Sequence, residues 1–438
     1  MNMSNSNFWN YTELEQLHIE LTNGCNAACP MCVRFHRNSP LARPDLEIGQ
    51  ITLEKFQQYF PPKVLRKCRT ILFCGVHGDA GTARDTLEIM QYISDSCQDS
   101  KTAVRMISNG GMRKSQWWAE LGQVFAKNYK KDWGVTFSID GLEDTNHLYR
   151  RNVKWPVLMD NVKSYIDAGG RALWDFLIFK HNEHQLEEAE RVCYELGFKE
   201  FRPKKALGVD NGTSLSILYA MNAQGQVDYT IEAPVNPKNR NLENPSGPTL
   251  DYANNFDPAE YWEAKDRRGE PVGNNGIDRF EQIPFSVEVG KVYDVIARSD
   301  YATFDSTEIA CKSQTHTGGK EIFVDQAGRV MPCCYVGTHL NSKFFDPKTT
   351  QLHYHMNNYG WDKFDLNLHS LQEILEAGHL NRLWADSWSQ PSVREGKMAF
   401  CASVCPKNQP SAVDKIFMHE KMKSKPPHIW QTANKKDV

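Results

Sequence analysis

The sequence lacks several features that would place it in other classes of protein. No uninterrupted apolar stretch approaches the roughly 20 residues that span a bilayer, so no membrane partner is predicted. Residues 1–10 are polar and contain neither the basic nor the apolar part of a signal peptide. With 51 Lys and Arg against 54 Asp and Glu, the formal net charge is −3, and no basic excess favours a nucleic acid partner. We therefore expect a cytoplasmic protein.

Cysteine, in contrast, is plentiful. The 438 residues include 12 cysteines, and several of them are grouped at short spacings. In a long chain without an export signal, such groups predict metal binding rather than disulfide bonds.

The first two hundred residues alternate strand-like and helix-like segments, which predicts parallel strands joined by crossover helices. We expect six strands, at 17–21, 70–75, 104–109, 134–140, 173–179 and 200–203. Amphipathic helices are expected between them, at 53–59, 85–96, 116–126, 157–168 and 185–196. Six such units make an open, partial barrel rather than a closed barrel of eight. Because functional residues in parallel barrels gather where strands end, the loops after these strands are expected to share one pocket.

Three cysteines follow the first expected strand on one short loop. They are Cys25, Cys29 and Cys32, and Gly24 directly before them permits a sharp turn. A cubane iron–sulfur cluster normally has four thiolate ligands, so three leave one iron open to a ligand that is not protein. A zinc site completed by His36, or three inert buried thiols, are the alternatives.

This Cys-x3-Cys-x2-Cys loop after a first strand resembles that of the radical S-adenosylmethionine (SAM) superfamily. The resemblance implies that Cys25, Cys29 and Cys32 hold a [4Fe–4S] cluster whose open iron binds the amino and carboxylate groups of SAM. In that family, one electron from the cluster cleaves SAM to methionine and a 5′-deoxyadenosyl radical, which removes hydrogen from a substrate. It also implies an electron donor such as flavodoxin or ferredoxin.

The turns after the second and third strands carry polar groups suited to SAM. Gly78 and Asp79 lie in the run His-Gly-Asp-Ala, which resembles the family's Gly-Gly-Glu-Pro motif that contacts the SAM amino group, with Asp in place of Glu. Ser108 and Asn109 resemble the Thr-Asn-Gly segment that lies near SAM in related enzymes. For Asp79, a capped turn before the next helix is the alternative.

The later strand ends supply further candidates. Ser138 and Asp140 lie two residues apart on a strand, so their side chains share one face. They belong to a Ser-Ile-Asp-Gly segment that resembles one in the family. On this resemblance, Ser138 is expected to contact the ribose or the carboxylate of SAM. Of the two arginines that follow, Arg151 rather than Arg150 is predicted to pair with the methionine carboxylate, a solvated position being the alternative. Asn182 is predicted to contact adenine.

A second group of cysteines lies closer to the C-terminus: Cys311, Cys333, Cys401 and Cys405. Residues 321–333 predict a hairpin that returns Cys333 toward Cys311. Gly328 and Cys333, in a Gly-x4-Cys element, resemble the SPASM domain of radical SAM enzymes and its shorter relative, Twitch, which implies one auxiliary [4Fe–4S] cluster. Cys334 could replace Cys333, and a four-cysteine zinc site is the alternative.

The sequence therefore predicts a radical SAM enzyme of mixed α/β fold. We expect a partial (β/α)6 TIM-like barrel over 1–207 and a small C-terminal α+β auxiliary-cluster domain over 311–410. Between them, residues 208–310 are expected to form a connector or substrate-binding insertion with a strand at 286–293. Residues 411–438 are expected to form a tail. A peptide or protein side chain is the first expected substrate and a small metabolite the second. A metal-binding protein without catalysis, in which the cysteines are structural or carry electrons, is the alternative class.

Overall fold

The computed structural model describes residues 8–35, 46–206, 217–222, 226–239, 304–311, 313, 320–340 and 347–407. The strand expected at 286–293, His36 and the tail at 411–438 lie outside the described residues. Among the helices that are described, none combines the length and the apolar character needed to cross a bilayer.

Six parallel strands form the body of the fold. They are β1 (Leu14–Ile19), β2 (Thr70–Phe73), β3 (Ala103–Ser108), β4 (Gly134–Ser138), β5 (Ala172–Ile178) and β6 (Phe201–Lys205). Each pairs in parallel with the next, so the order in the sheet follows the order in the chain. Every strand overlaps its expected range, and the predicted mixed α/β fold with six strand units is confirmed.

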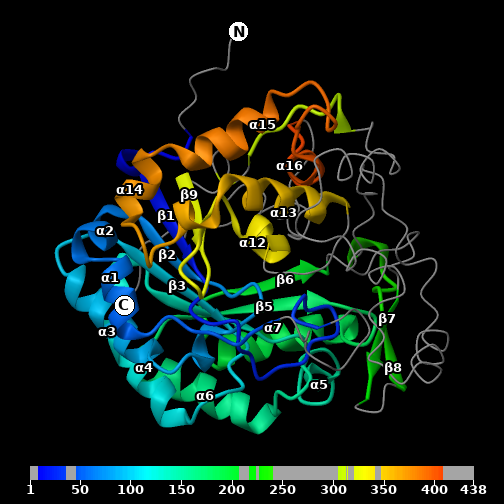
Figure 1. The fold of residues 1–438 in the computed structure, drawn as a ribbon. Helices are drawn as coiled ribbons and strands as arrows, with labels where there is room; N and C mark the ends of the chain where they lie inside the picture. Colours follow the sequence, from blue (N-terminus) through cyan, green and yellow to red (C-terminus); the bar gives the residue numbers. More distant parts are fainter. Residues whose placement is uncertain are drawn as a thin grey trace, which may run out of the picture.

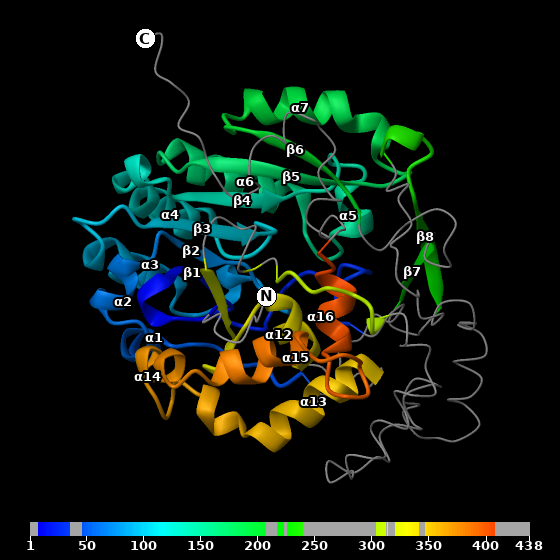
Figure 2. The ribbon, with the colours of Figure 1, turned by 90° about the horizontal axis from the view of Figure 1, so that it is seen from above.

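Helices between these strands cover the outer face of the sheet (Figures 1 and 2). Their apolar stripes face inward; the Trp118 ring, for example, packs on Phe137 of β4 with the ring centroids 5.2 Å apart. The helices are α1 (Leu53–Tyr59), α2 (Pro62–Lys67), α3 (Thr86–Ser96), α4 (Ser115–Lys127), α5 (Asn146–Tyr149), α6 (Trp155–Asp167) and α7 (Leu186–Glu195). Of these, α2 and α5 were not predicted.

The predicted C-terminal hairpin forms, and it extends the same sheet. It consists of β9 (Lys320–Val324) and β10 (Val330–Met331). Gly328 in its turn has a φ of +87°, and a Cβ there would lie 2.8 Å from the Tyr59 hydroxyl, so the position suits glycine. β9 pairs in parallel with β1, giving eight strands in the order β10-β9-β1-β2-β3-β4-β5-β6. The sequence did not predict this long-range pairing.

The other α-helices that the structure describes come from the C-terminal third of the chain. They are α12 (Cys334–Leu340), α13 (Pro347–Tyr359), α14 (Leu371–Glu376), α15 (Asp386–Trp388) and α16 (Ala399–Val404). Figure 2 shows α12, α13 and α16 on the side of the sheet opposite to α3, α4 and α6. The hairpin of β9 and β10 therefore joins these helices to the barrel.

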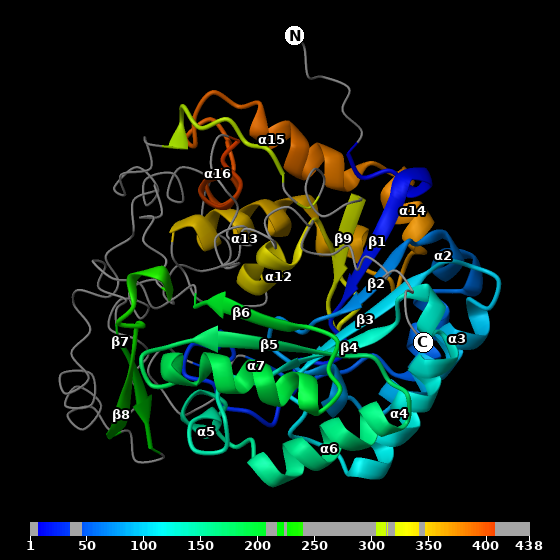
Figure 3. The ribbon, with the colours of Figure 1, turned by 180° about the vertical axis from the view of Figure 1, so that it is seen from behind.

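A separate antiparallel pair, β7 (Ile217–Met221) and β8 (Val227–Glu232), stands beyond the end of β5 and β6 (Figure 3). The amide of Lys180 donates to the carbonyl oxygen of Glu232 at 3.0 Å, which ties β8 to the loop after β5.

Candidate functional site

The loop that carries the first three cysteines leaves the sheet at the carboxyl end of β1. Neighbouring loops hold it: the Asp79 amide and the Thr82 hydroxyl each donate to the carbonyl oxygen of Gly24 at 2.8 Å. The Ala28 amide donates to the carbonyl oxygen of Arg151 at 3.0 Å. These partners follow β2 and β4, so the carboxyl ends of the parallel strands meet around the cysteine loop, as expected.

The three thiols of this loop lie close enough to influence one another. The pKa of Cys25 is raised to about 12, by burial first and then by Asp79 and the other two cysteines. Burial likewise raises the pKa of Cys32 to about 11, and Cys29 adds to the shift. Thiolates here need a compensating cation, which iron provides, so three such thiols on one loop fit the ligand set of an iron–sulfur cluster.

In the part of the chain that the structure describes, no three His, Cys, Asp or Glu side chains are grouped to hold a single metal ion. The ligands of a cubane cluster can lie farther apart than the ligands of a single metal ion, because each cysteine binds a different iron.

Asp79 is buried in a hydrogen-bond network that includes the predicted residues Ser108 and Asn109. Its Oδ2 accepts from the Asn109 amide at 2.8 Å, from Asn109 Nδ2 at 2.9 Å and from the Ser108 hydroxyl at 3.1 Å. Its Oδ1 accepts from the Gly81 amide at 3.0 Å. Burial raises the pKa of Asp79, and these donors oppose that shift. The structure thus brings Asp79, Ser108 and Asn109 together beside Cys25, whose Sγ lies 3.6 Å from Asn109 Nδ2.

Glu20 is a residue of this site that the sequence analysis missed. It follows β1 directly and is fully buried. Its Oε1 accepts from the amides of His77 at 2.6 Å and Gly78 at 3.1 Å, in the loop that carries Asp79. Its Oε2 lies 3.7 Å from His77 Nδ1. The available signal was an acidic residue at the end of an apolar strand, directly before the cysteine loop.

Replacing Glu20 with alanine is expected to lower the free energy of unfolding by roughly 2–4 kcal/mol, because two amides of a neighbouring loop lose their acceptor. Urea unfolding followed by circular dichroism measures the change. Glu15→Ala on the same strand is the matched control, since the half-exposed Glu15 pairs with Arg69 at the surface, 3.4 Å away, an interaction worth under about 1 kcal/mol. Equal losses in both variants would contradict this role for Glu20.

Arg150, not Arg151, is the arginine that the structure places beside the cysteines. Arg150 Nη1 lies 3.7 Å from Cys29 Sγ, and Arg150 Nε donates to Asp140 Oδ2 at 2.6 Å. Arg151 instead pairs with Asp228 at 3.3 Å, on a partly exposed surface. The contact of Arg151 with the SAM carboxylate stays a prediction, and Arg150 joins the site.

Asp140 and Asn182 tie strand ends together. Asp140 Oδ1 accepts from the Leu177 amide at 2.6 Å, while Asn182 Nδ2 donates to the carbonyl oxygens of Asp140 and Leu177, both at 2.9 Å. Asn182 Oδ1 accepts from the Phe179 amide at 2.7 Å. These bonds join the end of β5 to the segment after β4, and the half-buried Ser138 is the last residue of β4. The contacts of these three residues with SAM stay predictions.

The four cysteines predicted to form a second site line one small cavity: Cys311, Cys333, Cys401 and Cys405. Tryptophan, phenylalanine and aliphatic side chains form the rest of its wall. Cys401 and Cys405 lie one helical turn apart, since the Cys405 amide donates to the Cys401 carbonyl oxygen at 2.8 Å. Burial raises the pKa of Cys333 and of Cys401, and neighbouring cysteines add to both shifts. Four thiols around one cavity with apolar walls fit the ligand set of a cubane cluster, in which each thiolate binds a different iron, better than a single zinc ion, on which all four would have to converge.

Cys334 is not among the residues that line this cavity. It lies beside His18 of β1, whose Nε2 donates to the carbonyl oxygen of Cys74 at 2.7 Å and whose Nδ1 lies 3.5 Å from Glu321 Oε1. The two adjacent cysteines therefore have different surroundings, Cys333 in the wall of the cavity and Cys334 beside His18. The geometry favours Cys333 as the fourth ligand.

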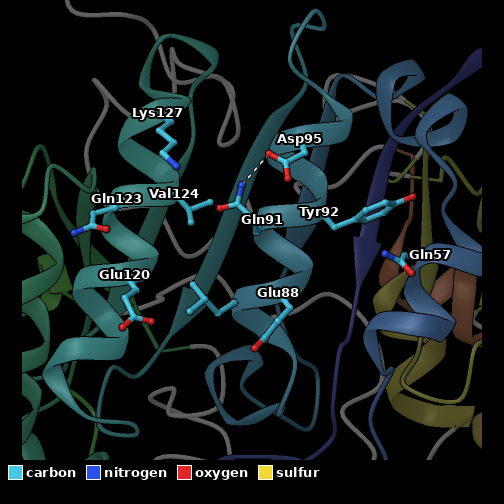
Figure 4. A pocket seen from close by; sticks show the side chains of 10 residues that line it. Gln57, Glu88, Gln91, Tyr92, Asp95, Glu120, Gln123, Val124 and Lys127 are labelled. Carbon is cyan, nitrogen blue, oxygen red and sulfur yellow. Dashed lines mark hydrogen bonds between the residues drawn. The ribbon is translucent and has the colours of Figure 1, made fainter.

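A groove of about 540 Å³ lies on the outer face of the barrel, between α3 and α4 (Figure 4). Most of the residues that line it have polar side chains, and four of these are charged: Glu88, Asp95, Glu120 and Lys127. Gln91 donates to Asp95 at 2.8 Å within α3. Its described lining residues include no cysteine and none of the residues around the cysteine loop, so it is not part of the site described above.

No family model matches the chain, and no curated protein sequence matches it. Among solved structures, anSMEcpe with bound AdoMet is 14% identical over 87% of this chain and 88% of that chain, with a TM-score of 0.43. Streptococcus suis SuiB bound to S-adenosylmethionine is 13% identical over 74% of this chain, with a TM-score of 0.39, and this chain spans 61% of the length of SuiB. SuiB bound to the precursor peptide SuiA gives a TM-score of 0.41 at 12% identity.

The chain therefore has a remote structural likeness to two proteins whose structures were solved with bound S-adenosylmethionine, at low sequence identity. These likenesses are remote, with each of the three TM-scores below 0.5, so the function proposed below depends on this chain's own residues.

Proposed function

We propose that this chain is a radical SAM enzyme. The observation that carries the proposal is the set of three neighbouring thiols on one loop at the carboxyl end of β1: the buried Cys29 and the partly buried Cys25 and Cys32. The loops after β2, β3 and β4 surround them with a carboxylate, an amide and a guanidinium. A [4Fe–4S] cluster on this loop, with SAM on its open iron, supplies the one-electron cleavage of SAM.

The chain's own residues position and shield that chemistry. Glu20 holds the loop of Asp79 against the cysteine loop, and Asp79 in turn fixes Asn109 beside Cys25. In this proposal Asp79 accepts a hydrogen bond from the ammonium group of SAM. The surrounding parallel sheet, with its buried apolar side chains, limits access of water to the reacting atoms.

We further propose that Cys311, Cys333, Cys401 and Cys405 hold an auxiliary [4Fe–4S] cluster. The proposal is supported by the cavity that all four thiols line. Four protein ligands leave no position open for a substrate, which favours acceptance of an electron from a substrate radical, and hence a net oxidation, over substrate binding.

The proposed substrate is a peptide or protein side chain, on the resemblance described above. Deuterium transferred from a labelled candidate peptide into 5′-deoxyadenosine would support this class, and transfer only from a small metabolite would replace it.

The direct test is formation of 5′-deoxyadenosine, measured by mass spectrometry after anaerobic reconstitution with iron and sulfide and addition of SAM and dithionite. We expect product from the wild type and from Cys193→Ala, which changes a buried cysteine of α7 far from both groups, and none from Cys29→Ala. Product from Cys29→Ala would contradict the proposed site. A wild type that holds its clusters but yields no product, even with candidate peptides added, would favour an electron-transfer protein.

A further inference from the structure

Two side-chain N–H groups are directed at sulfur atoms of the cysteine loop. Arg150 Nη1 lies 3.7 Å from Cys29 Sγ, and Asn109 Nδ2 lies 3.6 Å from Cys25 Sγ. Both distances fit a hydrogen bond to sulfur. Asn109 is neutral and is shared with Asp79, whereas Arg150 brings a full positive charge to the loop.

The Arg150 guanidinium is held in this orientation. Its Nε donates to Asp140 Oδ2 at 2.6 Å, and its side chain is only 18% exposed. Asp140 is itself fully buried and fixed, because its Oδ1 accepts from the Leu177 amide and its own amide donates to Asn146 Oδ1. In this ion pair the Arg150 guanidinium therefore faces Cys29, while the Asp140 carboxylate faces the backbone amide of Leu177.

Other cations near the loop are placed differently. Arg151 turns to Asp228 on the surface, with its side chain over the Tyr229 ring. Arg34 lies near Cys32 but donates to the carbonyl oxygen of Asn23. Arg150 thus differs from both neighbours in pointing an N–H group at a ligand sulfur.

We propose that Arg150, oriented by Asp140, raises the reduction potential of the [4Fe–4S] cluster that Cys25, Cys29 and Cys32 hold. This inference rests on the function proposed above. Adding one electron to a cluster with three thiolate ligands makes an already anionic group more negative. A buried cation that also donates to a ligand sulfur stabilises the reduced form more than the oxidised form. The role is one of tuning through Cys29, without contact with the substrate.

The test is a redox titration of the reconstituted protein without SAM, monitored by electron paramagnetic resonance. The signal that is missing from Cys29→Ala identifies the cluster of the cysteine loop. We expect Arg150→Met, which removes charge and donor but keeps a similar stem, to shift the midpoint potential of this signal to a more negative value. Arg151→Met, the same change one residue along, is expected to leave it in place.

Asp140→Asn provides a variant of opposite sign. It removes the negative charge behind Arg150 while keeping a similar shape, so we expect the midpoint potential to move to a more positive value. An Arg150→Met protein that holds its cluster and titrates at the wild-type potential would overturn the inference. Should Arg150→Met fail to take up the cluster, an unshifted potential in Asp140→Asn would overturn it instead. A wild type that binds no iron–sulfur cluster at the cysteine loop would refute the proposed function itself, a result distinguishable from both.

Discussion

Reconstituted Cys405→Ala protein should contain about four iron atoms per chain where the wild type contains about eight, because one of two cubane clusters loses a ligand. Among the residues that the structure describes, the cavity lined by Cys311, Cys333, Cys401 and Cys405 has no other cysteine or histidine in its wall to replace the missing thiolate. Cys333→Ala should produce the same loss. Iron and acid-labile sulfide analysis, together with elemental mass spectrometry, measures both variants.

Cys334→Ala is the matched control for this prediction, since it changes the adjacent cysteine, which lies beside His18 and outside the cavity. It should retain the full iron content. Loss of four irons from Cys334→Ala but not from Cys333→Ala would show that the ligand was assigned to the wrong cysteine. Loss of one zinc in place of four irons from Cys405→Ala would identify the second site as a zinc site.

Gly78→Ala is expected to have the other large effect, because two loops of the site approach each other there more closely than any side chain allows. A Cβ on Gly78 would lie 1.9 Å from the carbonyl oxygen of Thr22 and 2.8 Å from the Cα of Asn23. Both are backbone atoms directly before the cysteine loop, so one loop must move. We expect a loss of about 3 kcal/mol in the free energy of unfolding. Formation of 5′-deoxyadenosine should also fall by at least about tenfold, since Asp79 moves with Gly78.

Gly49→Ala is the control for this substitution. Gly49 lies near the same loop and its amide donates to Asn23 Oδ1, but a Cβ there would meet only Gln326 Cγ at 3.4 Å, an ordinary contact. Its stability should change by less than about 0.5 kcal/mol. Urea unfolding and the 5′-deoxyadenosine assay apply to both variants, and wild-type behaviour of Gly78→Ala in both assays would show that the loops tolerate separation.

The sequence was sufficient to predict the six parallel strands and the loops that follow them, because buried strands and amphipathic helices have distinct apolar patterns. It also grouped Asp79, Ser108 and Asn109 correctly, since the ends of parallel strands necessarily meet. What it could not predict was the direction of individual side chains. Arg150 and Arg151 are adjacent and chemically identical, and only the packed structure shows that the first points to Cys29 and the second to Asp228.

The same limit applies to Cys333 and Cys334, since only the packed structure shows that the first lines the cavity and the second lies beside His18. Glu20 was missed for a different reason. Its partners are the amides of His77 and Gly78 on another loop, and because almost every residue has a backbone amide donor, no residue type in the sequence identifies these two as the partners of Glu20. The pairing of β9 with β1 likewise cannot be predicted from the local sequence, since alternating apolar residues predict a strand but not its partner.

That pairing has a consequence for the order in which the molecule can be completed. Gln16 of β1 and Glu321 of β9 are 305 residues apart, yet their side chains share a hydrogen bond inside the sheet. During synthesis one edge of the first strand therefore stays unpaired until about 305 further residues have been made. An exposed strand edge readily pairs with other chains, so a fragment ending after β6 would be prone to aggregate. β1, which leads into the cysteine loop, can pair on both edges only after β9, which lies between the first two cysteines of the second group, has been made.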